Sequence, residues 1–274
     1  MREYQDSLVL LSVIMETSPS NDERVKTGAQ FRDLIAGMLK NPSSFEFPFD
    51  SLKSLSKITA PDRSFRLYTW MIRTVDKSRY IYSGFIQMQG EKENPGKLFL
   101  LSDSSLQMNE PHRAKLRNDN WFGAYYFKII QNKKTYTLLG WKGKDLQSTM
   151  KVIDALSFSG GKPKFGTGIF PSVIRKDKKP MKNLNRILFE YNSRAAMTLK
   201  YESKMDMIIF DHLAPPDRSM EGIFNFYGPD LSFDGLQFSG SRWIYFPDVD
   251  VRNPDAPVRK HRRTSREKEL YKTK

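Results

Sequence analysis

The segment FDHLAPPDRSMEGIFNFYGPDLSFDGLQF (210–238) contains the residues of this 274-residue chain whose types could perform acid–base or metal chemistry. Asp211 and His212 stand side by side near its start, and Asp230 and Asp234 lie four residues apart near its end. A carboxylate beside an imidazole can transfer protons or ligate a metal ion. The candidate catalytic residues are therefore Asp211, His212, Asp230 and Asp234, and the candidate metal ligands are Asp211, His212 and Asp234.

The same segment also has an ordinary structural interpretation. Neighbouring residues on a strand point to opposite faces, so Asp211 and His212 serve one site only if the backbone bends there. Gly-Pro-Asp and Asp-Gly are common turn dipeptides. The spacing of Asp230 and Asp234 also lacks the other ligands of an EF-hand calcium loop. We therefore favour two β-turns between strands, and we predict no cofactor.

Three further patterns have two interpretations each. The glycine-rich stretch 159–168 lacks the Gly-Lys-Ser/Thr ending of a phosphate-binding loop, so Gly160-Gly161 is better explained as a hairpin turn. The aspartates and the arginine of 248–255 form either an ion pair or a ligand cluster. The tryptophans could stack on sugars, although tryptophan in aromatic strands usually belongs to the core. These are Trp70, Trp121, Trp141 and Trp243.

Charge and composition exclude several function classes. The net charge is +14, but residues 259–274 alone account for +6, which leaves the rest of the chain only mildly basic. No zinc-finger, helix-turn-helix or RNA-binding motif accompanies the charge, so nucleic acid is not the expected partner. The absence of cysteine excludes disulfides, thiolate nucleophiles and iron–sulfur sites. No apolar run approaches the length of a membrane span, and the first residues make a poor signal peptide.

The hydrophobic pattern changes from a helical to a strand period after residue 45. Apolar residues at helical spacing predict a helix over 4–15, and a Ser20–Glu23 capping box begins a second helix that ends before Pro42. Short aromatic runs separated by hairpin-length gaps then predict antiparallel strands. These runs are 64–72, 79–88, 97–101, 122–130, 135–141, 186–191, 196–201, 207–211, 222–228 and 242–246. Residues 143–158 are compatible with a short helix that continues into a strand.

These elements predict an α+β fold that is mainly β. A helical hairpin (1–44) packs on a large antiparallel β-meander (45–254), which is a sandwich, an open barrel or a partial propeller. We expect the basic tail (255–274) to be disordered, because like charges repel and few apolar residues are available to pack.

Several stretches resemble a family of uncharacterised proteins from Bacteroidota. They are FPFDSLKSLSKITAPDRSFRLYTW (47–70), YTLLGWKGKD (136–145), 151–170 and MIIFDHLAPPDRSMEGIFNFYGPDLSFDGLQFSGSRWIYFPDVDVRNP (207–254). The resemblance implies no activity. It implies an exported envelope protein whose leader precedes the helical segment. It also implies that relatives often carry an aspartate where this chain has Lys142, so a chemical role of that acid would be lost here.

The leading hypothesis is a non-enzymatic, envelope-associated protein that binds a partner or polymer, such as an envelope protein, a glycan or an anionic surface. The first alternative is a hydrolase acting on glycans or related polymers through Asp211, Asp230 or Asp234 with His212. It requires these side chains to meet in one cleft. The second alternative is binding of an anionic polymer through the C-terminal tail. We expect a periplasmic or envelope location, with the cytoplasm as the alternative.

Overall fold

The computed structural model describes residues 2–91, 95–173 and 183–251. Two N-terminal helices precede three antiparallel sheets, with 43% of residues in strands and 21% in helices. The predicted mainly-β α+β class is confirmed, and the described strands form open sheets rather than a closed barrel. In this part of the chain, no helix is both long and apolar enough to cross a membrane.

The helical hairpin consists of α1 (Arg2–Thr17) and α2 (Asn21–Leu39), close to the predicted positions. Ser20 caps α2 by accepting a hydrogen bond from the backbone N–H of Glu23 at 3.4 Å. The buried guanidinium of Arg24 donates to the carbonyl oxygens of Ser18 and Arg73, each at 2.7 Å. Arg24 therefore ties the turn of the hairpin to the end of a strand in the sheet beneath it.

The strands are grouped into three sheets, which we call the first, middle and third sheets. The first sheet has the order β1 (Ser56–Thr59), β2 (Phe65–Arg73), β3 (Tyr80–Met88) and β4 (Leu98–Ser102). The middle sheet has the order β5 (Leu116–Arg117), β9 (Lys162–Phe165), β8 (Ser148–Ser159), β7 (Thr135–Gly143) and β6 (Tyr125–Asn132), and β10 (Arg186–Asn192) also pairs with β8. The third sheet has the order β11 (Leu199–Glu202), β12 (Met207–Ala214), β13 (Gly228–Ser239) and β14 (Arg242–Phe246).

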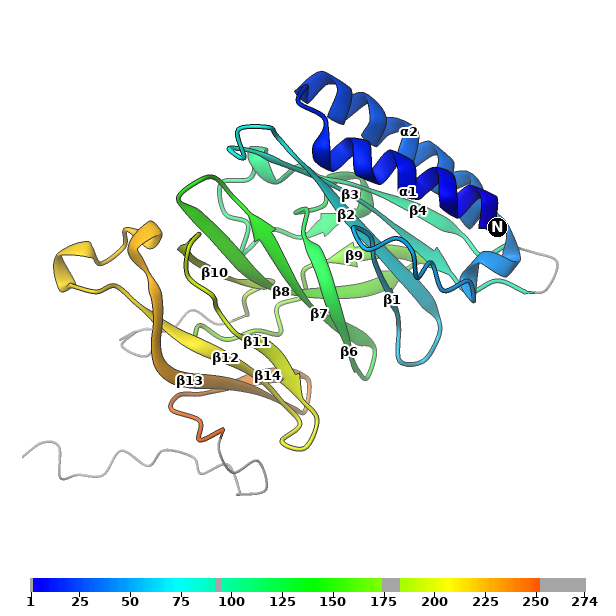
Figure 1. Cartoon of the computed structure of the whole chain (residues 1–274). Coiled ribbons are helices and arrows are strands. Elements are labelled where there is room, and N and C mark those ends of the chain that lie inside the picture. Colours follow the sequence, from blue (N-terminus) through cyan, green and yellow to red (C-terminus); the bar gives the residue numbers. More distant parts are fainter. Residues whose placement is uncertain (1, 92–94, 174–182, 252–274) are drawn as a thin grey trace, which may run out of the picture.

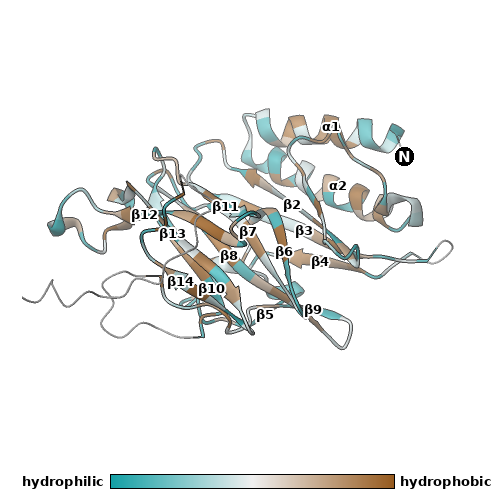
Figure 2. Cartoon of the chain, turned by 90° about the horizontal axis from the view of Figure 1, so that it is seen from below, coloured by the Kyte–Doolittle hydropathy of each residue, from teal (hydrophilic) through white to brown (hydrophobic). Residues whose placement is uncertain are grey.

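The hairpin and the three sheets are stacked as successive layers (Figure 1). Strand β2 explains this stacking, because its two faces pack against different layers. Tyr68 and Trp70 pack with the helices, and Phe65 and Leu67 pack against the middle sheet. The other face of the middle sheet contributes Ile153 to a core shared with the third sheet. Apolar residues accordingly concentrate on the stacked strands, whereas the helices alternate apolar and polar faces (Figure 2).

Three local predictions are wrong. Residues 222–228 are not a strand, since Phe224–Phe226 form a 3₁₀ turn in the loop between β12 and β13. The supposed turns of 228–239 are one strand, β13, which contains a bulge of three residues opposite His212. In this bulge Leu231 has a φ of 69°, so the turn dipeptides bend the strand without ending it. Residues 143–158 contain no helix, because a turn leads directly into β8.

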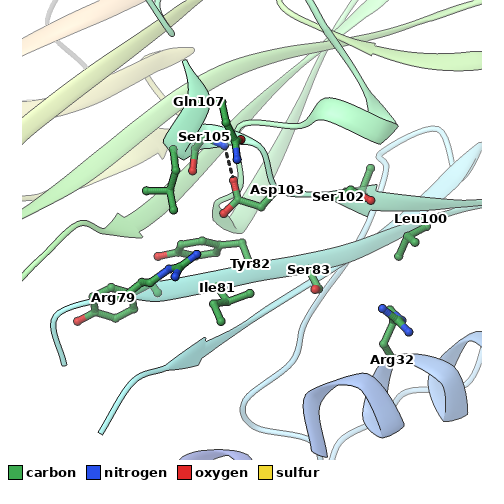
Figure 3. A pocket seen from close by; sticks show the side chains of 13 residues that line it. Arg32, Arg79, Ile81, Tyr82, Ser83, Leu100, Ser102, Asp103, Ser105 and Gln107 are labelled. Carbon is green, nitrogen blue, oxygen red and sulfur yellow. Dashed lines mark hydrogen bonds between the residues drawn. The ribbon is translucent and has the colours of Figure 1, made fainter. Parts of the chain in front are cut away.

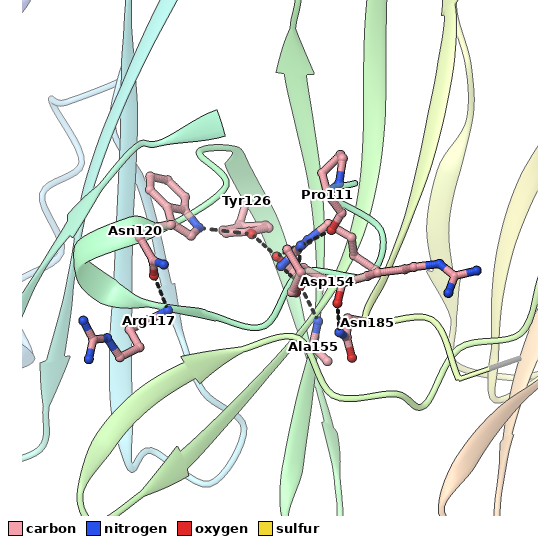
Figure 4. Close-up of polar contacts among 11 residues, drawn as sticks. Pro111, Arg117, Asn120, Tyr126, Asp154, Ala155 and Asn185 are labelled. Carbon is pink, nitrogen blue, oxygen red and sulfur yellow. Dashed lines mark hydrogen bonds and ion pairs between the residues drawn. The ribbon is translucent and has the colours of Figure 1, made fainter. Parts of the chain in front are cut away.

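A buried ion pair joins β8 to β10 in the middle sheet (Figure 4). Two nitrogens of the Arg186 guanidinium each lie 3.2 Å from a carboxylate oxygen of Asp154, and both side chains are fully buried. Tyr126 donates its hydroxyl to Asp154 at 3.0 Å, and Trp121 donates its indole N–H to Tyr126 at 3.3 Å. Arg186 also donates to the carbonyl oxygens of the 111–114 segment, so the charges are well satisfied.

Replacing one member of this pair is expected to be far more damaging than replacing both. R186M leaves the carboxylate of Asp154 buried without its cation, and should lower the free energy of unfolding by about 3–5 kcal/mol. The double variant D154L/R186M removes both charges and should be clearly more stable than R186M. Urea unfolding of the three proteins measures this. A double variant no more stable than R186M would show that side-chain shape, not charge pairing, dominates.

Candidate functional site

The structure brings three of the four predicted site residues together and separates the fourth. His212 Nδ1 lies 3.0 Å from Asp234 Oδ2, and His212 Nε2 lies 4.0 Å from Asp230 Oδ2. The bulge in β13 makes this possible, because it places Asp230 opposite His212. The carboxylate of Asp211 instead accepts a hydrogen bond from the backbone N–H of Thr198 at 2.6 Å, beside β11. Asp211 therefore takes no part in the His212 cluster.

Asp234 holds the end of the third sheet together. Its fully buried carboxylate accepts hydrogen bonds from the hydroxyl of Tyr245 at 2.7 Å and from the backbone N–H of Asp248 at 3.0 Å. In the tautomer that carries its proton on Nδ1, His212 donates to this carboxylate and Nε2 is an acceptor, which is the arrangement of a general base. Among the residues that the structure describes, no three or more His, Cys, Asp or Glu side chains are grouped to hold a metal ion. The catalytic and metal roles of this cluster stay hypotheses.

A second candidate site lies where β4 stops pairing with β3. The pairing runs only as far as Ser83 opposite Ser102, so the start of β3 has no strand beside it on that edge. The chain turns away at Asp103 and continues into a 3₁₀ turn, Ser105–Gln107. The space between the two segments is a cavity of about 280 Å³, which we call the β3–β4 cavity (Figure 3).

The walls of this cavity combine aromatic, hydroxyl and cationic groups. Tyr80 and Tyr82 form a nearly stacked pair with ring centroids 6.5 Å apart. Arg32 enters from α2 and Arg79 from the β2–β3 turn. Within the described chain, the guanidinium of Arg79 has no carboxylate partner, whereas Arg32 pairs with Asp33 at an exposed position. The remaining polar groups that line the cavity are Ser83, Ser102, Asp103, Ser105 and Gln107.

A buried lysine supports the carboxylate of this cavity. Lys142 is only 8% exposed, and its Nζ lies 3.8 Å from Asp103 Oδ2 and donates to the carbonyl oxygen of Gly123 at 2.8 Å. The ammonium also faces the ring of Tyr82 at 4.2 Å. Burial lowers the pKa of Lys142 from 10.5 to about 8, although the nearby Asp103 opposes this shift. A titratable pair perturbed by burial at a cavity is typical of functional sites.

Gly123 is required for this arrangement. A Cβ at this position would lie 2.3 Å from the carboxylate carbon of Asp103, and the φ of 67° favours glycine. Asp103 is further oriented by the backbone N–H of Ser105, which donates to Oδ1 at 2.9 Å. The carboxylate is therefore fixed by a backbone donor on one side and by the close approach of the Gly123 backbone on the other.

No sequence pattern indicated that most residues of the β3–β4 cavity belong to a functional site. Arg32, the Arg79–Tyr82 stretch and Asp103 come from three separate segments, and no local motif links them. Lys142 was noted only for the aspartate that relatives carry at its position. The sole available signal was the Gly-Trp-x-Gly stretch around Lys142, where a lysine stands in a strand with no other charged residue.

The lowered pKa of Lys142 should make stability depend on pH. Between pH 8 and 10.5 the unfolded chain holds a proton on this amine that the folded chain has lost, so stability rises with pH in that window. Relative to K142M, the wild type should gain about 3 kcal/mol of unfolding free energy from pH 8 to 10.5. Urea unfolding of the wild type and K142M between pH 8 and 10.5 tests this prediction. The Lys164→Met variant, which removes an exposed lysine, is the control. A constant difference between wild type and K142M would contradict it.

The comparisons with known proteins identify neither site. Comparisons of this chain with protein-family models, with curated proteins and with solved structures found no match. The resemblance to Bacteroidota proteins stays a prediction. The functional argument therefore depends on the geometry and chemistry of the residues themselves.

Proposed function

We propose that this protein binds a small polyhydroxylated anion, such as an acidic sugar, in the β3–β4 cavity. The observation that carries the proposal is Arg79, a cation at the cavity wall without a carboxylate partner among the described residues. A guanidinium in this position suits a carboxylate or phosphate of a ligand, because it can donate two parallel hydrogen bonds.

The other walls of the cavity suit the uncharged part of a sugar. The partly exposed Tyr80 offers a ring surface to the C–H face of a pyranose, while Asp103 and Gln107 can bind its hydroxyl groups. Tyr82 is only 2% exposed and instead packs beside Tyr80 and Lys142. The volume of about 280 Å³ is small for a ligand site and fits a single sugar residue better than a cofactor. The predicted role was that of an envelope-associated binding protein. For a protein of that kind, an acidic sugar is the ligand that this cavity supports best.

The family, the periplasmic or envelope location and the domain division stay predictions. So does polymer binding through the basic tail, which lies outside the described residues. A glycan partner is compatible with the proposed location, since acidic sugars are common in cell envelopes and outside cells. The proposal needs neither nucleic acid nor a metal ion.

Replacing Arg79 should weaken binding of the acidic sugar selectively. Isothermal titration with sodium glucuronate should show roughly a 10- to 100-fold loss of affinity for R79Q, because a charge-assisted hydrogen bond is lost. R242Q removes the same charge from β14 and should bind like the wild type. Glucose, which lacks the carboxylate, should bind R79Q and the wild type equally. Equal losses in R79Q and R242Q would indicate only general charge attraction.

A second candidate function is hydrolysis of an ester by the His212 cluster, which the contact between His212 and Asp234 favours. Nε2 would accept a proton from a water molecule whose oxygen attacks the carbonyl carbon. The ester C–O bond then breaks, and the leaving alkoxide or phenoxide departs and takes up the proton from Nε2, which leaves the acid as the second product. The variant H212Q should then lower the rate of p-nitrophenyl acetate hydrolysis at least 100-fold, while H112Q, at a separate loop histidine, should not. Equal rates in wild type, H212Q and H112Q would exclude this function.

A further inference from the structure

A second polar cavity is lined by the β7–β8 turn. It measures about 300 Å³, and we call it the β7–β8 cavity. Its walls come from three places, the β7–β8 turn, β10 and the loop before β13. The groups that matter for ligand binding are Lys144, Asp145, Gln147, Glu190, Phe224 and Asn225.

The end of β7 contacts residues of the β3–β4 cavity and continues into the wall of the β7–β8 cavity. Gly143 packs directly on the ring of Tyr80, where an added Cβ would approach to 2.5 Å. Its backbone N–H donates to the hydroxyl of Tyr82 at 2.7 Å. The next residue, Lys144, already lines the β7–β8 cavity. The β2–β3 turn, the β7–β8 turn and the loop before β13 therefore follow one another along a single edge of the molecule (Figure 1).

The loop that carries Phe224 is held in place by a series of hydrogen bonds. Asn225 Nδ2 donates to Gln147 Oε1 at 3.1 Å, and Asn192 Nδ2 donates to the carbonyl oxygen of Asn225 at 2.7 Å. The backbone N–H of Asn192 donates to the carbonyl oxygen of Tyr227 at 2.9 Å. Phe224 packs against Tyr227 with ring centroids 5.1 Å apart, yet stays 47% exposed. An exposed ring is thus fixed beside amide and carboxylate groups.

The charges of the two cavities differ. Two arginines and one aspartate line the β3–β4 cavity, so it favours the anionic part of a ligand. Lys144, Asp145 and Glu190 line the β7–β8 cavity, and Lys144 is already paired with Glu190 at 2.8 Å. This cavity disfavours a second anion. It offers a ring surface and hydrogen-bonding groups instead, which suit the hydroxyls of a neutral sugar.

We infer that the ligand is an extended oligosaccharide with one acidic residue, which occupies the β3–β4 cavity while neutral sugars cross the β7–β8 turn and reach Phe224. This inference rests on the proposed function and adds the size of the ligand and the direction in which it lies. Because the two cavities would engage one molecule, the second contact adds affinity without the full entropic cost of a separate binding event.

The test compares ligands of different length on the same set of variants. The probes are sodium glucuronate, unbranched xylotriose, and a short xylan oligosaccharide that carries one glucuronic acid residue. Isothermal titration should show that the acidic oligosaccharide binds roughly tenfold more tightly than glucuronate. The variant F224A should abolish this gain without changing the affinity for glucuronate. F226A is the matched control, since Phe226 is 44% exposed in the same loop but does not line the cavity.

The outcomes separate this inference from the proposed function. If glucuronate binds but the oligosaccharide gains nothing, the extended ligand is wrong and the single-sugar function stands. If F226A loses the gain as F224A does, the loop makes only general apolar contact and the inference fails. If neither acidic ligand binds the wild type, the proposed function fails first. Thermal unfolding of F224A and F226A confirms that both variants are folded.

Discussion

The buried pair of Asp154 and Arg186 is the interaction on which the rest of the structure depends. Removing two charges from water costs several kcal/mol per ion, and only good geometry and further hydrogen bonds offset that cost. Here the two residues lie directly opposite each other in the register of β8 and β10. A shift of one residue would separate the charges and leave both buried without a partner. The pair therefore selects one register at the centre of the middle sheet, and the network extends through Tyr126 to Trp121.

The position of the middle sheet explains why the candidate binding surface is made of turns. Both of its faces are covered by other sheets, so its strand side chains are used for packing. Side chains that bind or react with a ligand must therefore lie where the strands end. The turn at 144–147 contacts the 192–195 turn and the loop before β13, and the neighbouring Gly143 contacts Tyr80 of β3. Side chains on these turns are not needed for the core, while the sheets beneath them hold the turns rigidly.

The sequence was sufficient to predict the class of fold but only part of the site. Strand runs such as 79–88 and 242–246 were found because aromatic and β-branched residues were bounded by turn residues. Prediction failed at 222–239, where turn dipeptides form a bulge inside a strand and exposed aromatic residues form a loop. The bulge depends on Leu231 adopting a positive φ, which no propensity favours. Opposite orientations of Asp211 and His212 were foreseeable from strand geometry, whereas the meeting of Asp103 and Lys142 needed the three-dimensional structure.

The helical hairpin has a consequence beyond its packing on the first sheet. Arg32 of α2 lines the β3–β4 cavity, so one wall of that cavity belongs to a layer held to the sheet by apolar contacts and by Arg24. A ligand in contact with Arg32 binds only while the hairpin is attached. Ligand binding and local opening of the hairpin are then thermodynamically linked, and an occupied cavity would slow the exchange of backbone amide hydrogens in α2. The two helices thereby become a reporter of ligand occupancy.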